Sequence, residues 1–134
     1  MRGILALLLC FGLVGCATMQ EATAPNRTNL LKLSIGMGKA EAISVMGTAP
    51  AIAHYKDNFG YPHSFPINNP YRSEILQGKD KTFEVLYYAT DVKKDDNAIT
   101  DDELTPLVFD NGKLIGWGWS FLQDNAQKYE IRIR

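Results

Sequence analysis

The stretch from Gly3 to Val14, GILALLLCFGLV, is uncharged and apolar, and it follows one basic residue, Arg2. A helix that crosses a bilayer needs roughly 20 apolar residues, so this run is too short to span one. Its length and position are typical of the hydrophobic region of a signal peptide. We expect residues 1–15 to be removed, which leaves one cysteine and no intramolecular disulfide. Packing alone must then hold the domain together.

The residues that end this run, Leu13-Val14-Gly15-Cys16, resemble the bacterial lipobox. The resemblance implies that the Cys16 thiol receives a diacylglyceryl group and that cleavage after Gly15 frees an amino terminus for acylation. Each buried methylene adds about 0.8 kcal/mol, so several acyl chains form a firm membrane anchor. Ala17 replaces the aspartate that is typical of inner-membrane retention. We therefore expect a lipoprotein of the outer membrane that faces the periplasm. The alternative, an uncleaved N-terminal anchor, is disfavoured by the shortness of the run.

Charge and composition divide the rest of the chain. Removal of Arg2 leaves thirteen basic and fifteen acidic side chains. This balance gives no electrostatic basis for binding nucleic acid or an anionic membrane surface. Residues 17–28, ATMQEATAPNRT, are small and polar and predict, behind lipidated residue 16, a flexible tether with a reach of about 20 Å. Residues 29–134 then form a single domain.

A helix is predicted at residues 39–46, KAEAISVM, with Gly38 as its N-cap and Gly47 as its left-handed stop. The preceding glycines and lysine do not form a phosphate-binding loop. Leu33 stands where that motif needs its first glycine, and Ala40 stands where it needs a hydroxyl. The glycines therefore bracket a helix.

Further elements follow from β-branched and aromatic runs and from turn residues. We expect strands at 51–55 and 81–92, a long loop at 57–72, an acidic connector at 93–103, a hairpin at 104–120, a helix at 121–129 and a strand at the C-terminus. In the hairpin, a three-residue loop would pair Phe109 with Lys113 and gather the large apolar residues, including Trp117 and Trp119, on one face. Gly116 and Gly118 would leave the other face flat, where another backbone or a helix could lie close. These elements predict an α+β fold with short N-terminal helices on an antiparallel sheet of about three to four strands.

This order of elements behind a lipobox is similar to the small outer-membrane lipoproteins related to BamE (SmpA/OmlA). That family carries a GMT-x-x-x-V-x-x-x-LG-x-P stretch after its tether. In this sequence the stretch maps onto Gly36-Met37-Gly38, Ile43 or Ala42, Met46-Gly47 and Pro50. Two departures are a glycine in place of the usual Ser/Thr cap and the extra Ala49 before the proline. The resemblance concerns fold and compartment over most of residues 29–119.

Few residue patterns favour chemistry. His54 and His63 are the only histidines, and His63-Ser64 lacks a nucleophile elbow. The acidic stretch at 91–103 lacks the glycine that a calcium loop needs at its sixth position. We expect no enzyme activity, no catalytic residue, no metal and no cofactor.

The loop at 57–72 holds the candidate binding residues Tyr61, Phe65, Tyr71 and Arg72. Aromatics and prolines lose little entropy when they dock, so this loop is a candidate partner-binding segment. The alternative is that its aromatics pack on the sheet. We expect a non-enzymatic interaction or scaffold lipoprotein at the outer membrane, whose partner is another envelope protein or a lipid. The alternative function is a periplasmic module that binds a small ligand or lipid between this loop and the sheet.

Overall fold

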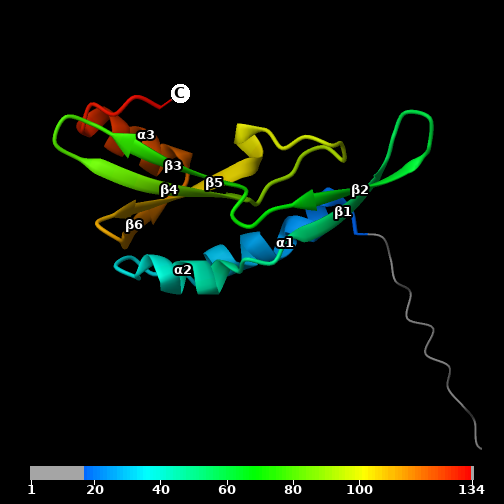
Figure 1. Cartoon of the computed structure of the whole chain (residues 1–134), viewed down its shortest axis with the longest axis horizontal. Coiled ribbons are helices and arrows are strands. Elements are labelled where there is room, and N and C mark those ends of the chain that lie inside the picture. Colours follow the sequence, from blue (N-terminus) through cyan, green and yellow to red (C-terminus); the bar gives the residue numbers. More distant parts are fainter. Residues whose placement is uncertain (1–16, 134) are drawn as a thin grey trace, which may run out of the picture.

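The structure is a computed structural model that describes residues 17–133 (Figure 1). Cys16 and the expected signal peptide lie outside the described residues. The helices are α1 (Met19–Leu30), α2 (Lys39–Met46) and α3 (Trp119–Lys128), with a short 3-10 turn at Asp101–Glu103. The strands are β1 (Ala51–Lys56), β2 (Pro62–Ile67), β3 (Arg72–Gln77), β4 (Thr82–Ala89), β5 (Leu104–Asp110) and β6 (Lys113–Trp117). This arrangement confirms the predicted α+β fold.

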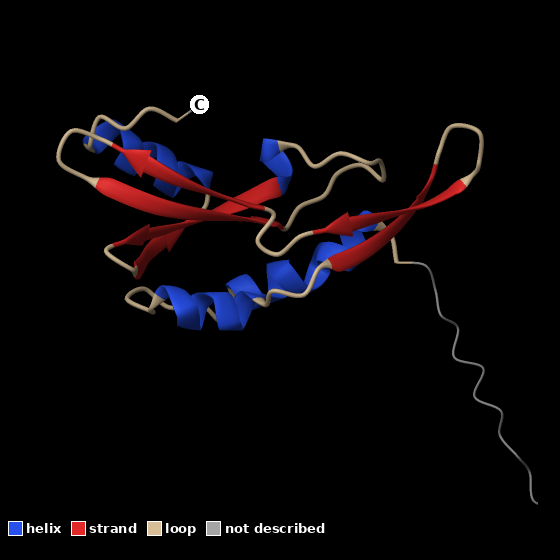
Figure 2. Cartoon of the chain, viewed as in Figure 1, coloured by secondary structure: helices blue, strands red, loops and turns tan. Residues whose placement is uncertain are grey.

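Two antiparallel sheets organise the described chain. The larger has the strand order β3-β4-β5-β6, and β1 and β2 form a separate hairpin. The large sheet lies between α3 on one face and the N-terminal helices on the other (Figure 2). Successive strand residues face opposite sides, so Tyr87 of β4 packs in the cluster beside α3 and Tyr88 packs in the cluster beside α2. A sheet buried on both faces explains why β4 is apolar or aromatic, and buried, at every position from Val85 to Ala89.

The expected tether is instead helix α1, which corrects the predicted boundary at residue 29. Thr18 and Glu21 form a capping box: the Thr18 hydroxyl accepts from the Glu21 N–H at 3.2 Å, and the Glu21 carboxylate accepts from the Thr18 N–H at 2.9 Å. The buried residues of this helix are Met19, Thr23 and Asn26. Since two of those three residues are polar, composition alone made the segment resemble a solvated linker.

Hydrogen bonds satisfy the buried polar residues of α1. The Thr23 hydroxyl donates to the Met19 carbonyl at 2.9 Å. The Asn26 amide donates to the Ala89 carbonyl at the end of β4 and to the Asn69 side chain, both at 2.9 Å. Buried polar groups with partners cost little, so a polar helix can pack on the core. The folded domain therefore includes α1.

Helix α2 spans the predicted residues. Gly38 is its N-cap, and Gly47 adopts a φ of 85° at its C-terminus. Ala42 and Met46 are buried and face the sheet, as their spacing of four residues requires.

The predicted loop at 57–72 contains strand β2, so that prediction was wrong. Pro62 and Pro66 both lie in β2, which pairs along its length with β1. The His54 N–H of β1 points away from β2, because it donates to the Ala17 carbonyl at 2.8 Å. Strand residues alternate, so Pro62 and Pro66, which are in register with Lys56 and Ile52, also direct their nitrogens outward. Proline is tolerated at such edge positions because no ladder hydrogen bond is lost there.

The β5–β6 hairpin differs from the predicted register. Asn111 and Gly112 have φ of 49° and 74° and form a two-residue turn, so that Asp110 pairs with Lys113. A bulge between Val108 and Phe109 then shifts the pairing by one residue. The expectation of one buried face failed because the sheet is covered on both sides.

Helix α3 fills the space that Gly116 leaves. A Cβ added at Gly116 would lie 2.6 Å from ring atoms of Phe121, so the predicted close approach is confirmed at Gly116, where a side chain of the helix makes it. It is not found at Gly118, which is the N-cap of α3 and has no neighbour within 4 Å of an added Cβ. Trp119 starts this helix and does not extend the strand. The expected C-terminal strand is absent from residues 129–133, where the Ile131 N–H donates to the Ala126 carbonyl at 2.8 Å and Ile131 is buried.

Candidate interaction surfaces

The aromatic residues predicted to form one binding loop lie apart. Tyr61 is 66% exposed and lies beside the turn between β1 and β2, together with Phe59, which is 86% exposed. Phe65 of β2 and Tyr71, which precedes β3, are half-buried and pack against the core cluster beneath α3. The self-packing alternative therefore holds for Phe65 and Tyr71, and within residues 17–133 the exposed aromatics are Phe59 and Tyr61 at the hairpin turn.

Arg72 belongs to a polar cluster on β3 and β4. Its guanidinium lies 4.1 Å from the centre of the Tyr87 ring and 3.0 Å from the Asp101 carboxylate. The Tyr87 hydroxyl donates to the Glu74 carboxylate at 2.7 Å. Burial, together with this carboxylate, raises the pKa of Tyr87 far above its ordinary value. Arg72 is thus held by internal partners, which the sequence does not reveal because Tyr87 lies on β4 and Asp101 lies in the 3-10 turn, both distant along the chain.

The two histidines form separate pairs on the β1–β2 hairpin. His63 Nε2 lies 2.9 Å from the Asp57 carboxylate, and the Ser64 hydroxyl lies 3.1 Å from His54 Nδ1. His63 and Ser64 are neighbours in one strand, so their side chains point to opposite faces of it. Asp57 therefore pairs with one histidine and Ser64 with the other, so no single histidine links an acid to a hydroxyl as in a catalytic triad. The hydrogen bond from His63 and those from the Tyr61 and Phe59 N–H groups lower the pKa of Asp57.

The acidic connector is ordered by one buried carboxylate. Glu103 is 4% exposed and accepts from the Lys93 N–H at 2.7 Å and from the Thr100 N–H at 3.0 Å. Beside it, Asp102 pairs with Lys93 at 2.7 Å, and hydrogen bonds from Lys93 and Thr100 lower the pKa of Asp102 to about 2. Among residues 17–133, no group of three or more His, Cys, Asp or Glu side chains is placed to hold a metal ion.

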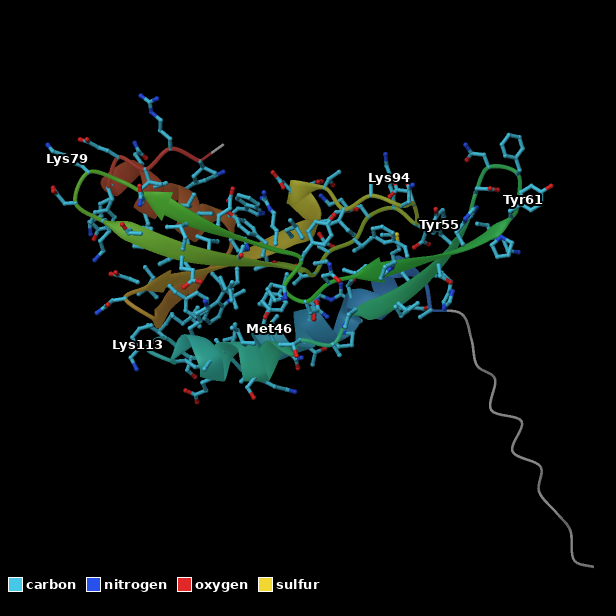
Figure 3. The ribbon with its side chains drawn as sticks, in the orientation of Figure 1. Met46, Tyr55, Tyr61, Lys79, Lys94 and Lys113 are labelled. Carbon is cyan, nitrogen blue, oxygen red and sulfur yellow. The ribbon has the colours of Figure 1, made fainter. Side chains whose placement is uncertain are left out.

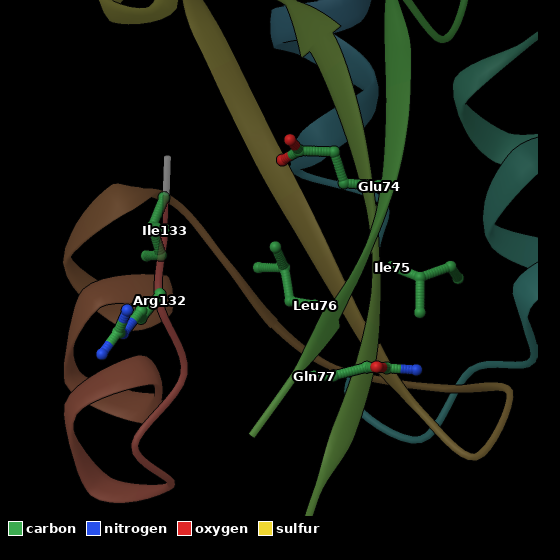
Figure 4. Close-up of a pocket in the computed structure, with 6 residues that line it drawn as sticks. All are labelled: Glu74, Ile75, Leu76, Gln77, Arg132 and Ile133. Carbon is green, nitrogen blue, oxygen red and sulfur yellow. The ribbon is translucent and has the colours of Figure 1, made fainter. Parts of the chain in front are cut away.

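The best-formed surface hollows of residues 17–133 are lined by other residues than the predicted binding residues. The hollow in Figure 4 has a volume of about 720 Å³ and lies between β3 and the C-terminal segment. It is lined by Glu74, Ile75, Leu76, Gln77, Arg132 and Ile133. Leu76 points toward the C-terminal segment, whereas Ile75 points to the other side of β3 and is 59% exposed. This hollow and four others formed by residues 17–133 are lined by none of Tyr61, Phe65 and Tyr71.

The outer edge of β6 is closed. The Gly36 N–H donates to the Leu114 carbonyl at 2.7 Å, and the Leu114 N–H donates to the Met37 carbonyl at 2.8 Å. The segment before α2 thus occupies the backbone groups that β6 would offer to another strand.

The outer edge of β3 is open within the described part of the chain. The Gly78 N–H points toward β4, because it donates to the Lys81 carbonyl at 2.8 Å. Alternation along the strand directs the backbone groups of Ser73, Ile75 and Gln77 outward. No backbone hydrogen bond within residues 17–133 joins these three to another segment. Unlike β2, strand β3 contains no proline.

Comparisons with known proteins give one match. The sequence model of a family described as "Protein of unknown function (DUF3192)" matches residues 66–124. The matched segment runs from the end of β2 into α3 and so contains the whole four-stranded sheet. No curated protein and no solved structure matches the chain. None of the helices in residues 17–133 is long and apolar enough to cross a membrane.

Proposed function

We propose that this protein is a non-enzymatic interaction module of the bacterial envelope, held at the periplasmic face of the outer membrane by a lipid on Cys16. Its partner is another envelope protein, which adds an extended segment to the outer edge of β3. The open edge of β3 is the observation that carries this proposal. An edge strand with free N–H and C=O groups is a template for pairing with another chain.

The contrast between the edges of the two sheets supports this choice. The segment before α2 covers the outer edge of β6, and Ala17 accepts a hydrogen bond from the outer edge of β1. The prolines of β2 leave its outer edge without the N–H groups that a further strand would need. Unprotected edges promote aggregation, so proteins usually cover or blunt them. An edge left open beside three protected ones fits a surface that another chain occupies.

Side chains beside this edge would give specificity. Ile75 offers an exposed apolar contact on one side of the strand. On the other side, Glu74 and Arg132 border the hollow of about 720 Å³ and offer both signs of charge. In strand addition the backbone supplies affinity, and pockets for alternate side chains supply selectivity. The alternative of a small-ligand module lacks such support, because Tyr61, Phe65 and Tyr71 do not converge.

A detergent-solubilised affinity purification tests the proposal. Ile75→Lys places a charge on the proposed contact edge, and Ile52→Lys is the matched control on β1, where Ile52 is also exposed. The proposal predicts that Ile75→Lys loses the co-purifying protein while Ile52→Lys keeps it. Equal recovery with both variants, at equal thermal stability, would exclude the β3 edge as the contact.

A further inference from the structure

The turn of the β1–β2 hairpin is the most exposed apolar feature at one end of the domain. Phe59 and Tyr61 are 86% and 66% exposed, and they lie close together in sequence at the turn. Figure 3 shows Tyr61 at this end and Lys79, on the turn between β3 and β4, at the opposite end. Exposed apolar side chains that lie together on a projecting turn mark an interaction surface. The domain core cannot bury these two rings unless the hairpin folds back onto it.

The described chain begins beside this hairpin. The Ala17 carbonyl accepts from the His54 N–H of β1 at 2.8 Å, and Thr18 already caps α1. Consequently no flexible spacer separates residue 16 from the folded domain. A lipid on Cys16 would attach one residue, or roughly 4 Å, from Ala17, so the end of the domain that carries the hairpin would face the bilayer.

We propose that the Phe59–Tyr61 turn inserts into the headgroup region of the phospholipid bilayer that holds the Cys16 lipid. The inference rests on the lipid anchor of the proposed function. From His54 to Asp57 the strand advances roughly 10 Å, so the turn extends past the anchor and away from the rest of the domain (Figure 1). Aromatic rings are enriched at membrane interfaces, where an apolar body and a polar tip are both accommodated.

The surroundings of the turn fit a lipid surface. Lys56, the last residue of β1, and Lys94, which Figure 3 labels on the same half of the domain as Tyr61, are both exposed and can meet phosphate groups. A hollow of about 300 Å³, lined by Thr18, His54, Tyr55, Lys56, Pro62 and Asp95, lies beside the start of α1. The contact depends chiefly on the two aromatic rings, since the chain carries no strong net charge. It gives the anchored domain a second point of attachment and so a fixed orientation on the membrane.

The single cysteine of the mature chain makes a fluorescence test direct. Asn58→Cys places one free thiol beside Phe59 at the turn, and Lys79→Cys places the control thiol at the opposite end. Each lipoprotein, with Cys16 intact, is labelled with an environment-sensitive fluorophore and reconstituted in phosphatidylcholine vesicles. We expect the label at residue 58 to shift to shorter wavelength and to be quenched by lipids with spin-labelled headgroups. The label at residue 79 should show neither change.

Two further readings separate the outcomes. The double substitution Phe59→Ser and Tyr61→Ser in the Asn58→Cys background should abolish the shift, and circular dichroism should show an unchanged fold because both side chains are exposed. Flotation of the same vesicles reports the anchor. If the protein floats with the vesicles but the label at residue 58 is as exposed to water as the label at residue 79, the insertion is overturned and the anchor stands. Protein that does not float overturns the anchor and the insertion together.

Discussion

Truncation of Met19 tests whether α1 is part of the fold. Met19 is fully buried in the core cluster that also contains Ala53 of β1 and Ile67 of β2, whereas its neighbour Gln20 is exposed on the same helical turn. Truncating a buried methionine to alanine removes its burial energy and leaves a cavity, at a cost of about 2–5 kcal/mol. Whole domains have a free energy of unfolding of about 5–15 kcal/mol, so Met19→Ala should remove a substantial fraction of it.

Urea denaturation of the unlipidated chain beginning at Ala17 measures this loss, with Trp117 and Trp119 as fluorescent reporters. A loss of about 3 kcal/mol would lower the midpoint by roughly 1–3 M at an unchanged slope. Gln20→Ala is the matched control on the same turn and should leave the midpoint near that of the parent. If the two variants have the same midpoint, α1 is not packed on the core, and residues 17–28 act as the tether that their composition suggested.

Three further predictions concern the sheet and the acidic connector. Gly116→Ala should lower the free energy of unfolding by about 1–3 kcal/mol, because its Cβ would lie 2.6 Å from the Phe121 ring. In a double-mutant cycle, Gly116→Ala should cost less in the Phe121→Ala background, where the clashing ring is absent. Gly112→Val should lower the melting temperature, because a β-branched residue resists the φ of 74° at the turn; an unchanged melting temperature would refute the turn. The Asp102 carboxyl should titrate near pH 2 by NMR and move toward its ordinary value of about 3.9 in Lys93→Met. Because the folded-state pKa of Asp102 is lowered, the stability that this carboxylate contributes is present above about pH 4 and is lost as the pH falls toward 2. An Asp102 titration midpoint that is the same in the parent protein and in Lys93→Met would contradict the ion pair.

Local signals in the sequence predicted the elements whose stability is local. Helix α2 was predicted correctly because Gly38 and Gly47 mark its ends and its apolar residues recur at helical spacing. The close approach at Gly116 was also predictable, since a residue without a side chain between large neighbours signals a packed backbone.

Elements stabilised by distant partners could not be predicted in this way. Helix α1 has polar buried residues, and Asn26 meets its partners 43 and 63 positions along the chain. Strand β2 contains two prolines, which are compatible with a strand only because its outer edge is unpaired. The hairpin register depended on knowing that both faces of the sheet are covered.

The candidate surfaces divide in the same way. The exposed aromatic at Tyr61 was visible in the sequence, because it lies in a turn rich in glycine and asparagine. Arg72 was selected for its charge, yet the structure holds it against Tyr87 and Asp101. The open edge of β3 has no sequence signature, because an edge is defined by which strands fail to pair with it.

Site-specific photo-crosslinking in living cells tests the central claim, that β3 receives a strand from another envelope protein. A photoreactive amino acid at position 75 lies on the open edge, and the same amino acid at position 52 is the exposed control on β1. We predict a discrete adduct of larger mass from position 75 alone, containing a second envelope protein. An adduct containing only a second copy of this chain, or no adduct beyond that from position 52, would contradict it.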